Sequence, residues 1–123
     1  MKTFTTSTGN AYLVMDYGKN SIPTDDIKYI EGDGNYSNFQ LSKGKSFISS
    51  FTLRTFTSKL NEERGFFSPR KGLLINLNYA NEIVTRGNSK FIKMKDGKEL
   101  QLSRRKGREL IDFLKDTKWD IGV

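Results

Sequence analysis

Four cations follow a serine near the C-terminus. Ser103 is a favoured residue for starting a helix, and the positions after it hold Arg104, Arg105, Lys106 and Arg108. A helix N-terminus carries about half a positive charge, so each cation in its first turn costs roughly 0.3–1 kcal/mol. A bound phosphate would offset this repulsion, because the free N–H groups of a helix start bind anions. The pattern therefore favours a phosphate site over a solvated basic turn whose repulsion is screened by salt.

Two further segments are polar and are expected to form exposed loops. They are Asp33–Tyr36, which contains Gly and Asn, and Ser68–Gly72, which contains Arg and Lys. Asn, Arg and Lys are the side chains that contact adenine and guanine edges in the major groove. Each segment alone favours an ordinary turn, but both together with the cationic helix start indicate nucleic acid. The sequence lacks helix-turn-helix, zinc-finger and basic-zipper patterns, so loops on a β scaffold are expected to make the contacts.

The overall charge supports a polyanionic partner. The 123 residues contain 21 Lys and Arg and 14 Asp and Glu, a formal net charge of +7. Residues 1–62 hold 7 basic and 6 acidic residues, a net +1, whereas residues 63–123 hold 14 and 8, a net +6. A basic domain of this kind is typical of proteins that bind nucleic acid or an anionic membrane surface.

The same composition argues against an enzyme. There is no Cys and no His, so the chain has no thiolate nucleophile, no cysteine zinc site and no imidazole base. The acidic pairs Asp25-Asp26 and Glu62-Glu63 are adjacent, and Asp33 is a single metal ligand, so we expect no catalytic residue, metal or cofactor. No apolar run reaches the roughly 18 residues of a membrane span, and the N-terminus has no signal-peptide core. We therefore expect a cytoplasmic protein that does not enter the membrane.

Short alternating segments predict a mainly β fold that positions these loops. Residues 27–49 are expected to form a three-stranded antiparallel meander with turns at 32–35 and 42–44. Further strands are expected at 11–15 (an edge strand), 73–77, 82–85, and on both sides of Asp96-Gly97. Residues 20–26 are expected to end a strand and turn.

Two short helices are expected, at about 52–64 and at 104–115. Leu53, Phe56 and Leu60 recur on one face of the first helix, and Gly65 is placed to end it. The length predicts one domain. We expect an N-terminal segment at 1–26, the domain proper at 27–116 and a tail at 117–123.

Residues 27–115 resemble a LytTR-type DNA-binding domain, the output domain of many bacterial response regulators. The resemblance covers about three quarters of the chain and rests on these segments in order: Ile27–Tyr36, Thr52-Leu53, Phe66–Leu77, Asp96-Gly97 and Leu102–Arg105. It implies an elongated, mainly β fold of short antiparallel sheets with two short helices. It also implies that loops enter successive major grooves of double-stranded DNA.

The resemblance further implies which residues contact DNA. In the family, bases are contacted from the meander turn, from the loop before the 73–77 strand and from the second helix start, which correspond here to Asn35, Lys71 and Arg105. Arg70 replaces the family's usual His and is expected as a fourth base contact, so the base preference of this loop is expected to differ. Phosphate contacts are expected from Arg104, Lys106, Arg108, Lys43, Lys45 and Lys90. For Tyr36 two roles are equally expected, a contact with a phosphate and packing within its hairpin.

Family members usually carry a receiver domain, but only about 26 residues precede Ile27. The chain is therefore expected to act alone or under a separate signalling protein, with two copies forming a homodimer on repeated half-sites. Two alternatives stay open. Aromatic residues on an open sheet face would favour an RNA-binding module. A free strand edge or an exposed apolar patch would favour a protein-interaction module, such as an antiregulator that pairs with a longer relative.

Overall fold

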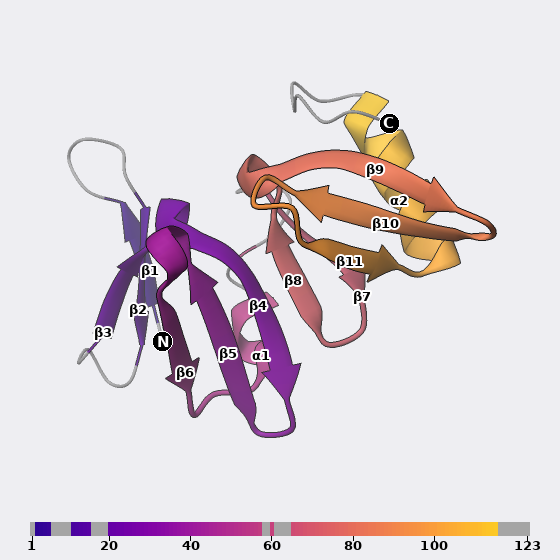
Figure 1. Ribbon diagram of the computed structural model, residues 1–123. Helices are drawn as coiled ribbons and strands as arrows, with labels where there is room; N and C mark the ends of the chain where they lie inside the picture. The colour runs from indigo at the N-terminus through magenta and orange to yellow at the C-terminus, as the bar shows by residue number, and fades with distance from the viewer. Residues whose placement is uncertain (1, 6–10, 16–19, 58–59, 61–64, 116–123) are drawn as a thin grey trace.

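The computed structural model describes residues 2–5, 11–15, 20–57, 60 and 65–115. These residues form antiparallel sheets and two α-helices, which confirms the predicted mainly β fold (Figure 1). The strands are β1 (Lys2–Thr5), β2 (Ala11–Met15), β3 (Asn20–Pro23), β4 (Ile27–Asp33), β5 (Tyr36–Leu41), β6 (Ser46–Ser49), β7 (Phe66–Arg70), β8 (Leu73–Asn76), β9 (Ala80–Arg86), β10 (Ser89–Met94) and β11 (Glu99–Leu102). The α-helices are α1 (Leu53–Thr57) and α2 (Arg104–Lys115), and 3-10 turns lie at Thr24–Asp26, Ser42–Gly44 and Leu77–Tyr79.

The predicted meander at 27–49 is confirmed as β4, β5 and β6. It is part of a larger sheet, in the order β6-β5-β4-β8-β7, which we call the main sheet. The local sequence does not reveal this extension, because Tyr29 of β4 pairs with the distant Ile75 of β8. Strands β11-β10-β9 form the second sheet, and β1-β2-β3 form the N-terminal sheet.

Two local predictions are wrong. The strand at 11–15 is not an edge strand, because β2 pairs with β1 on one side and with β3 on the other. The segment Ser68–Gly72 is not a loop throughout, because β7 continues to Arg70 and only Lys71 and Gly72 turn. The pairing shifts register between Phe67 and Arg70, and such an irregularity accommodates a proline within a strand.

The second helix is confirmed, since α2 spans the predicted residues 104–115. Of the first predicted helix, 52–64, α1 covers Leu53–Thr57, and residues 58–59 and 61–64 lie outside the described residues, as does the predicted tail at 117–123. Leu53, Phe56 and Leu60 do share one core, as their helical spacing predicts. No helix among the described residues is long and apolar enough to cross a membrane.

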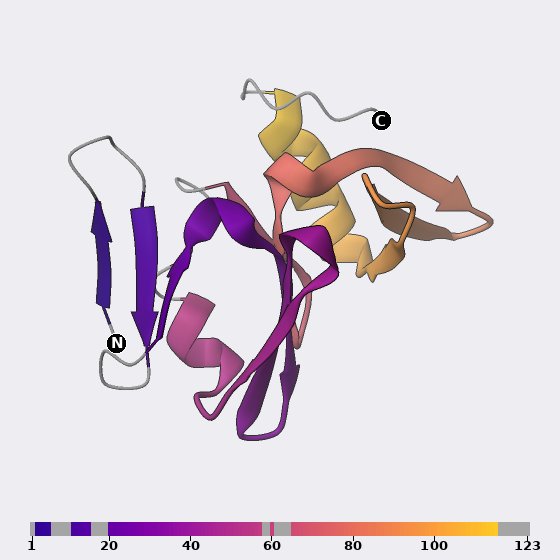
Figure 2. The same cartoon turned by 60° about the vertical axis from the view of Figure 1, so that its left-hand side comes forward.

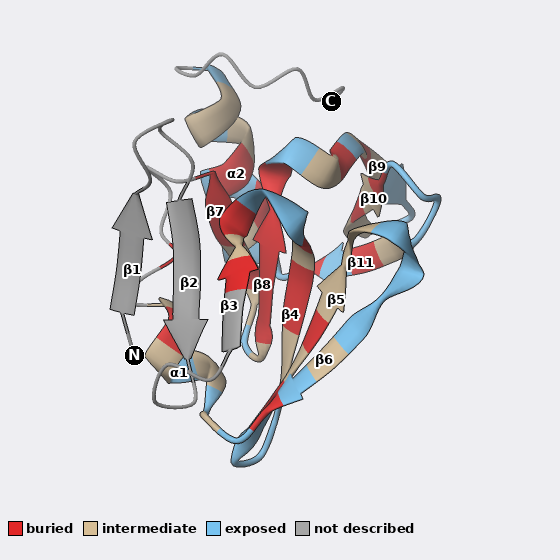
Figure 3. Cartoon of the chain, turned by 90° about the vertical axis from the view of Figure 1, so that its left-hand side faces the viewer, coloured by how far each residue is buried: buried red, intermediate tan, exposed pale blue. Residues whose placement is uncertain are grey.

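Hydrophobic cores lie on both faces of β4, β8 and β7. On one face, Ile30 lies in a core with Phe56 of α1. On the other, Tyr29 lies in a core with Ile92 of β10 and Leu110 of α2. Figure 2 shows α1 on one side of the main sheet and the second sheet with α2 on the other. The buried residues of β5 and β6 are Ser37, Phe39 and Ser49, which share one face, and Phe39 packs there in the core with Phe56 of α1. The opposite face, which we call the open face, carries no buried residue of these two strands, and Figure 3 shows their exposed and intermediate residues.

Polar contacts fix the second sheet against the main sheet. Lys28 Nζ lies 2.7 Å from Asp96 Oδ2, and Lys98 Nζ donates to the Tyr29 hydroxyl at 2.6 Å. The hydrogen bond from Lys28 lowers the pKa of Asp96, because it stabilises the carboxylate. The bond to Tyr29 raises the pKa of Lys98, because it stabilises the ammonium. These contacts hold together the two parts of the fold that carry the candidate residues.

Candidate nucleic-acid interface

The first candidate contact lies in the turn between β4 and β5. Asp33 pairs with Tyr36, so Gly34 and Asn35 alone make the turn. Gly34 has a φ of 60°, a left-handed conformation that glycine adopts without strain. All of these residues are exposed, which leaves Asn35 accessible at the end of the sheet.

The second candidate contact lies beside the first, in the Lys71–Gly72 turn between β7 and β8. Gly72 has a φ of 82°, and its carbonyl accepts a hydrogen bond of 2.8 Å from the amide of Gly32 in β4. This hydrogen bond joins the β4 strand end next to the first turn to the second turn. Exposed Lys71 and exposed Asn35 therefore lie at the same end of the main sheet (Figure 1).

Arg70 ends β7 directly before this turn. Its Nη1 donates to the Lys71 carbonyl at 3.4 Å, so the guanidinium lies along the turn. The Ser68 hydroxyl lies 3.1 Å from the carbonyl oxygen of Arg70 and 2.9 Å from that of Leu73. Ser68 therefore shapes the strand end that carries Arg70 and Lys71.

The third candidate contact is the start of α2. Ser103 caps the helix as predicted, since its hydroxyl accepts from the Lys106 amide at 3.2 Å. The Ser103 amide donates to the Pro69 carbonyl at 3.0 Å, which joins the start of α2 to β7 just before Lys71. We call the Gly34–Asn35 turn, the Lys71–Gly72 turn and the start of α2 together the turn edge (Figure 1).

The cations at the start of α2 differ in how far they are engaged within the protein. Lys106 Nζ lies 3.1 Å from Glu109 Oε2 and 5.7 Å from the centre of the Phe67 ring. Arg105 Nε lies 3.7 Å from Glu109 Oε1, but the side chain is 79% exposed. Arg105 is therefore the more available of the two for a ligand.

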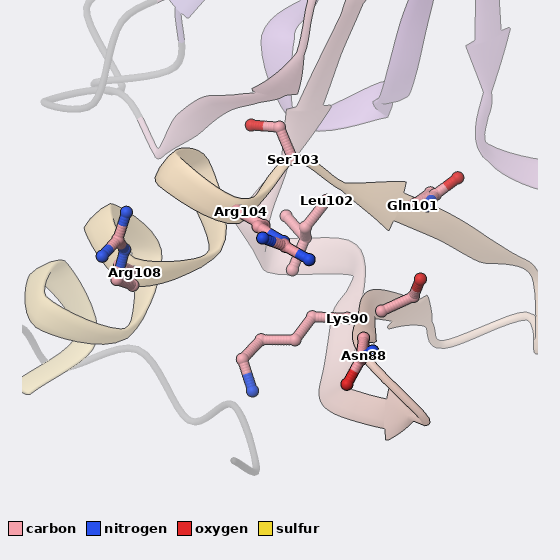
Figure 4. Close-up of a pocket in the computed structure, with 8 residues that line it drawn as sticks. Asn88, Lys90, Gln101, Leu102, Ser103, Arg104 and Arg108 are labelled. Atoms are coloured by element: carbon pink, nitrogen blue, oxygen red, sulfur yellow. The ribbon is translucent and has the colours of Figure 1, made fainter.

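Arg104 and Arg108 line a groove of about 610 Å³ between α2 and the second sheet (Figure 4). Lys90 of β10 joins them, and its stem packs on Gly107, where a Cβ atom would lie 3.4 Å from Lys90 Cδ. None of these cations forms an ion pair with a carboxylate among the described residues. The lining of this basic groove is Asn88, Ser89, Lys90, Gln101, Leu102, Ser103, Arg104 and Arg108. Cations that line one groove without acidic partners attract an anion.

Lys43 and Lys45 lie elsewhere, in the turn between β5 and β6. Strand pairing puts Leu41 opposite Ile27 at this end of the sheet. The six residues of β5 separate this end from the turn edge, a length of about 20 Å at about 3.3 Å per residue. We call Ser42–Lys45 the far turn.

The family model of the LytTr DNA-binding domain matches residues 18–115. The chain belongs to the LytTr family. No curated protein matches the chain. The LytTr DNA-binding domain of a putative methyl-accepting/DNA response regulator from Bacillus cereus is similar in fold, with a TM-score of 0.68 at 15% sequence identity, over 85% of this chain and 95% of that one.

In this LytTr domain the predicted site residues fall into separate groups. The predicted base contacts Asn35, Lys71 and Arg105 all lie on the turn edge, next to Arg70. The predicted phosphate contacts are divided. Arg104, Arg108 and Lys90 line the basic groove, Lys106 packs on β7, and Lys43 and Lys45 lie on the far turn.

Sequence reasoning missed two amide side chains that line the basic groove of the LytTr domain, Asn88 and Gln101. Asn88 lies in the β9–β10 hairpin turn, which looked like an ordinary turn. Close to it in sequence, Arg86 donates to the Glu99 carboxylate, from Nε to Oε1 at 3.0 Å and from Nη2 to Oε2 at 2.8 Å. These hydrogen bonds raise the pKa of Arg86 and lower that of Glu99. No local signal points to either amide, because only the packing of the second sheet on α2 brings them to the cations.

Proposed function

We propose that this LytTr domain binds double-stranded DNA sequence-specifically and acts as a bacterial transcriptional regulator. The observation that carries the proposal is the turn edge, where three exposed segments are joined by backbone hydrogen bonds. The bonds run from Gly32 to Gly72 and from Ser103 to Pro69. An edge fixed in this way presents its loops to one side of a duplex, where they enter successive major grooves.

The base contacts come from Asn35, Lys71 and Arg105, with Arg70 as a fourth. An Asn amide pairs with the N6/N7 edge of adenine, and Arg or Lys pairs with the O6/N7 edge of guanine. The 79% exposure of the Arg105 side chain supports its role, because a bidentate contact needs a free guanidinium.

The phosphate contacts come first from Arg104, Arg108 and Lys90, because three cations that line one groove suit a backbone phosphate. Lys106 contributes through its charge while it packs on Phe67. Tyr36 is 56% exposed beside Asn35, which suits donation to a phosphate. Lys43 and Lys45 on the far turn make the smallest contribution, because they meet phosphates only where the DNA passes beyond the turn edge.

The protein acts in the cytoplasm as a homodimer on repeated half-sites, because one turn edge covers only a short stretch of duplex. A separate signalling protein controls it.

A selection from random duplex DNA tests the proposal. The recovered sequences should share a motif, and the binding constant for the winner should fall steeply between two salt concentrations, as counterion release requires. Arg105→Ala should weaken binding to the motif far more than binding to random duplex. Salt-sensitive binding without any recovered motif would contradict sequence-specific binding and leave RNA or another protein as the partner.

A further inference from the structure

Strand β6 is a short edge strand of four residues that lacks several of the other usual protections against pairing. It ends the main sheet in the order β6-β5-β4-β8-β7, and its sequence Ser46-Phe47-Ile48-Ser49 has no charge and no proline. Its pairing with β5 has no register shift, so no bulge twists the edge away. Charges, prolines and bulges are common in natural edge strands, because an edge without them accepts another strand more readily. Figure 3 shows β6 at the outer side of the main sheet.

The peptide groups of Ile48 point outward from this edge. The Leu41 amide donates to the Lys45 carbonyl at 2.8 Å, so this pair is hydrogen-bonded. Antiparallel pairs alternate between hydrogen-bonded and non-bonded, which makes Asn38–Ile48 a non-bonded pair. The N–H and C=O of Ile48 therefore face away from β5, where an added strand would find a donor and an acceptor.

The open face beside this edge carries two exposed apolar side chains, Ile48 and Tyr36. The Ile48 side chain is 67% exposed and the Tyr36 side chain is 56% exposed, and both are large hydrophobic residues. The open face of β5 and β6 lies opposite the face that packs against α1. An apolar residue of a partner would gain from covering Ile48.

The groove next to Ile48 offers hydrogen-bond acceptors and negative charge. It measures about 500 Å³ and is lined by Glu31, Gly32, Asp33, Tyr36, Asn38 and Ile48. Asn38 Oδ1 is buried and accepts no hydrogen bond from any described residue. Asp33 forms no ion pair with a described residue, and Glu31 Oε1 lies 3.9 Å from Lys98 Nζ. In a chain of net charge +7 this acidic groove is suited to a cationic side chain.

We propose that β6 and the acidic groove bind an extended segment of a partner protein, which adds as a strand and carries an apolar residue together with Lys or Arg. The added strand hydrogen-bonds to Ile48 and covers its side chain, and the cation reaches Asn38 Oδ1 and the carboxylates. A second copy of the chain fits less well. The residues of another β6 that share this face are Ser46 and Ile48, and neither supplies a positive charge to the groove.

The test is a selection from a displayed library of random nine-residue peptides, with the full chain as target and no DNA present. Winners are synthesised, and their dissociation constants are measured by fluorescence anisotropy. We expect alternating apolar and basic residues, a loss of binding on Ile48→Lys, and a loss of about tenfold or more in the double variant Glu31→Gln, Asp33→Asn. Amide hydrogen exchange at Ile48 should slow when the peptide binds.

The matched control is Asn81→Lys, which adds the same charge at an exposed position on β9 and should leave peptide binding unchanged. Thermal melts check that each variant folds. We expect Ile48→Lys to fold, because the Ile48 side chain is mostly exposed. Winners without basic residues, or winners that bind Ile48→Lys as tightly as the parent, would overturn the proposal. Sedimentation that shows a dimer broken by Ile48→Lys would also overturn it and assign the edge to a second copy.

Discussion

The two ends of the main sheet carry similar residue types but differ in what surrounds them. Each end has a tight turn with exposed Lys and a left-handed glycine, Gly72 at the turn edge and Gly44 in the far turn. At the turn edge, backbone hydrogen bonds join the Lys71 turn to β4 and the adjoining β7 to the start of α2. In the far turn, the backbone hydrogen bonds close on the turn itself, from Leu41 to Lys45 and from Lys45 to Ser42.

This difference shows that the position of a cation decides more than its charge. Lys43 and Lys71 contribute equally to the net charge of the chain. Only Lys71 is fixed beside other side chains that can contact a duplex at the same time. Binding energy depends on contacts made together, because each isolated contact must by itself offset the freedom lost on association.

The largest expected difference in DNA affinity is between two double variants, one that removes two cations from the turn edge and one that removes two from the far turn. Lys71→Ala with Arg105→Ala should weaken binding to the selected DNA motif by about 2 kcal/mol or more, at about 1–3 kcal/mol for each base contact. Lys43→Ala with Lys45→Ala removes the same charge and should weaken binding to the motif by much less. Titrations of both variants on the motif and on random duplex measure the difference. Equal losses would contradict the distinction between the ends.

The basic groove should affect the salt dependence of binding rather than sequence preference. Arg104→Ala with Arg108→Ala should lower affinity for the motif and for random duplex alike. It should also make the slope of log K against log salt shallower by about 0.9 for each phosphate that the variant no longer neutralises. Titrations at several salt concentrations measure this slope. A loss confined to the motif would instead assign these arginines to bases.

Matched glycine substitutions separate local strain from DNA contact. Gly72 and Gly44 have φ values of 82° and 74°, and at both a Cβ atom would meet open space. Gly72→Ala and Gly44→Ala should each lower the free energy of unfolding by about 1–2 kcal/mol, the cost of a left-handed alanine. Only Gly72→Ala should also weaken binding to the motif, because it shifts Lys71. Urea unfolding and DNA titration of both variants give the comparison, and similar binding by the two would weaken the case for Lys71.

The smallest expected effect concerns the ion pair of Lys28 and Asp96, which joins the two sheets away from the turn edge. The lowered pKa of Asp96 means that the pair contributes stability above the ordinary carboxyl pKa of about 3.9. That contribution is lost as the pH falls through the lowered pKa. Asp96→Asn should cost about 0.2–1 kcal/mol near neutral pH, because the pair is partly exposed, and progressively less in acid. Thermal melts from pH 7 down to pH 3 should show the parent and the variant converging.

The sequence by itself determined the elements with a clear local pattern. Alternation and glycine-containing turns determined the meander at 27–49, and the Ser103 cap determined the start of α2, because these depend on residues close in the chain. The composition and the ordered motifs indicated the family that the comparison then showed. Local patterns failed at Ser68–Gly72, where polar residues at a strand end resembled a loop.

Only the tertiary structure decided which of the predicted residues lie together. The bond from Gly32 to Gly72 and the bond from Ser103 to Pro69 join segments far apart in the sequence, and they place Lys71 beside Asn35 and the start of α2. The same packing separates Lys43 from them by the length of β5 and brings Asn88 and Gln101 to the basic groove. The physical reason is that strand pairing and core packing, rather than residue type, fix the distances between distant parts of the chain.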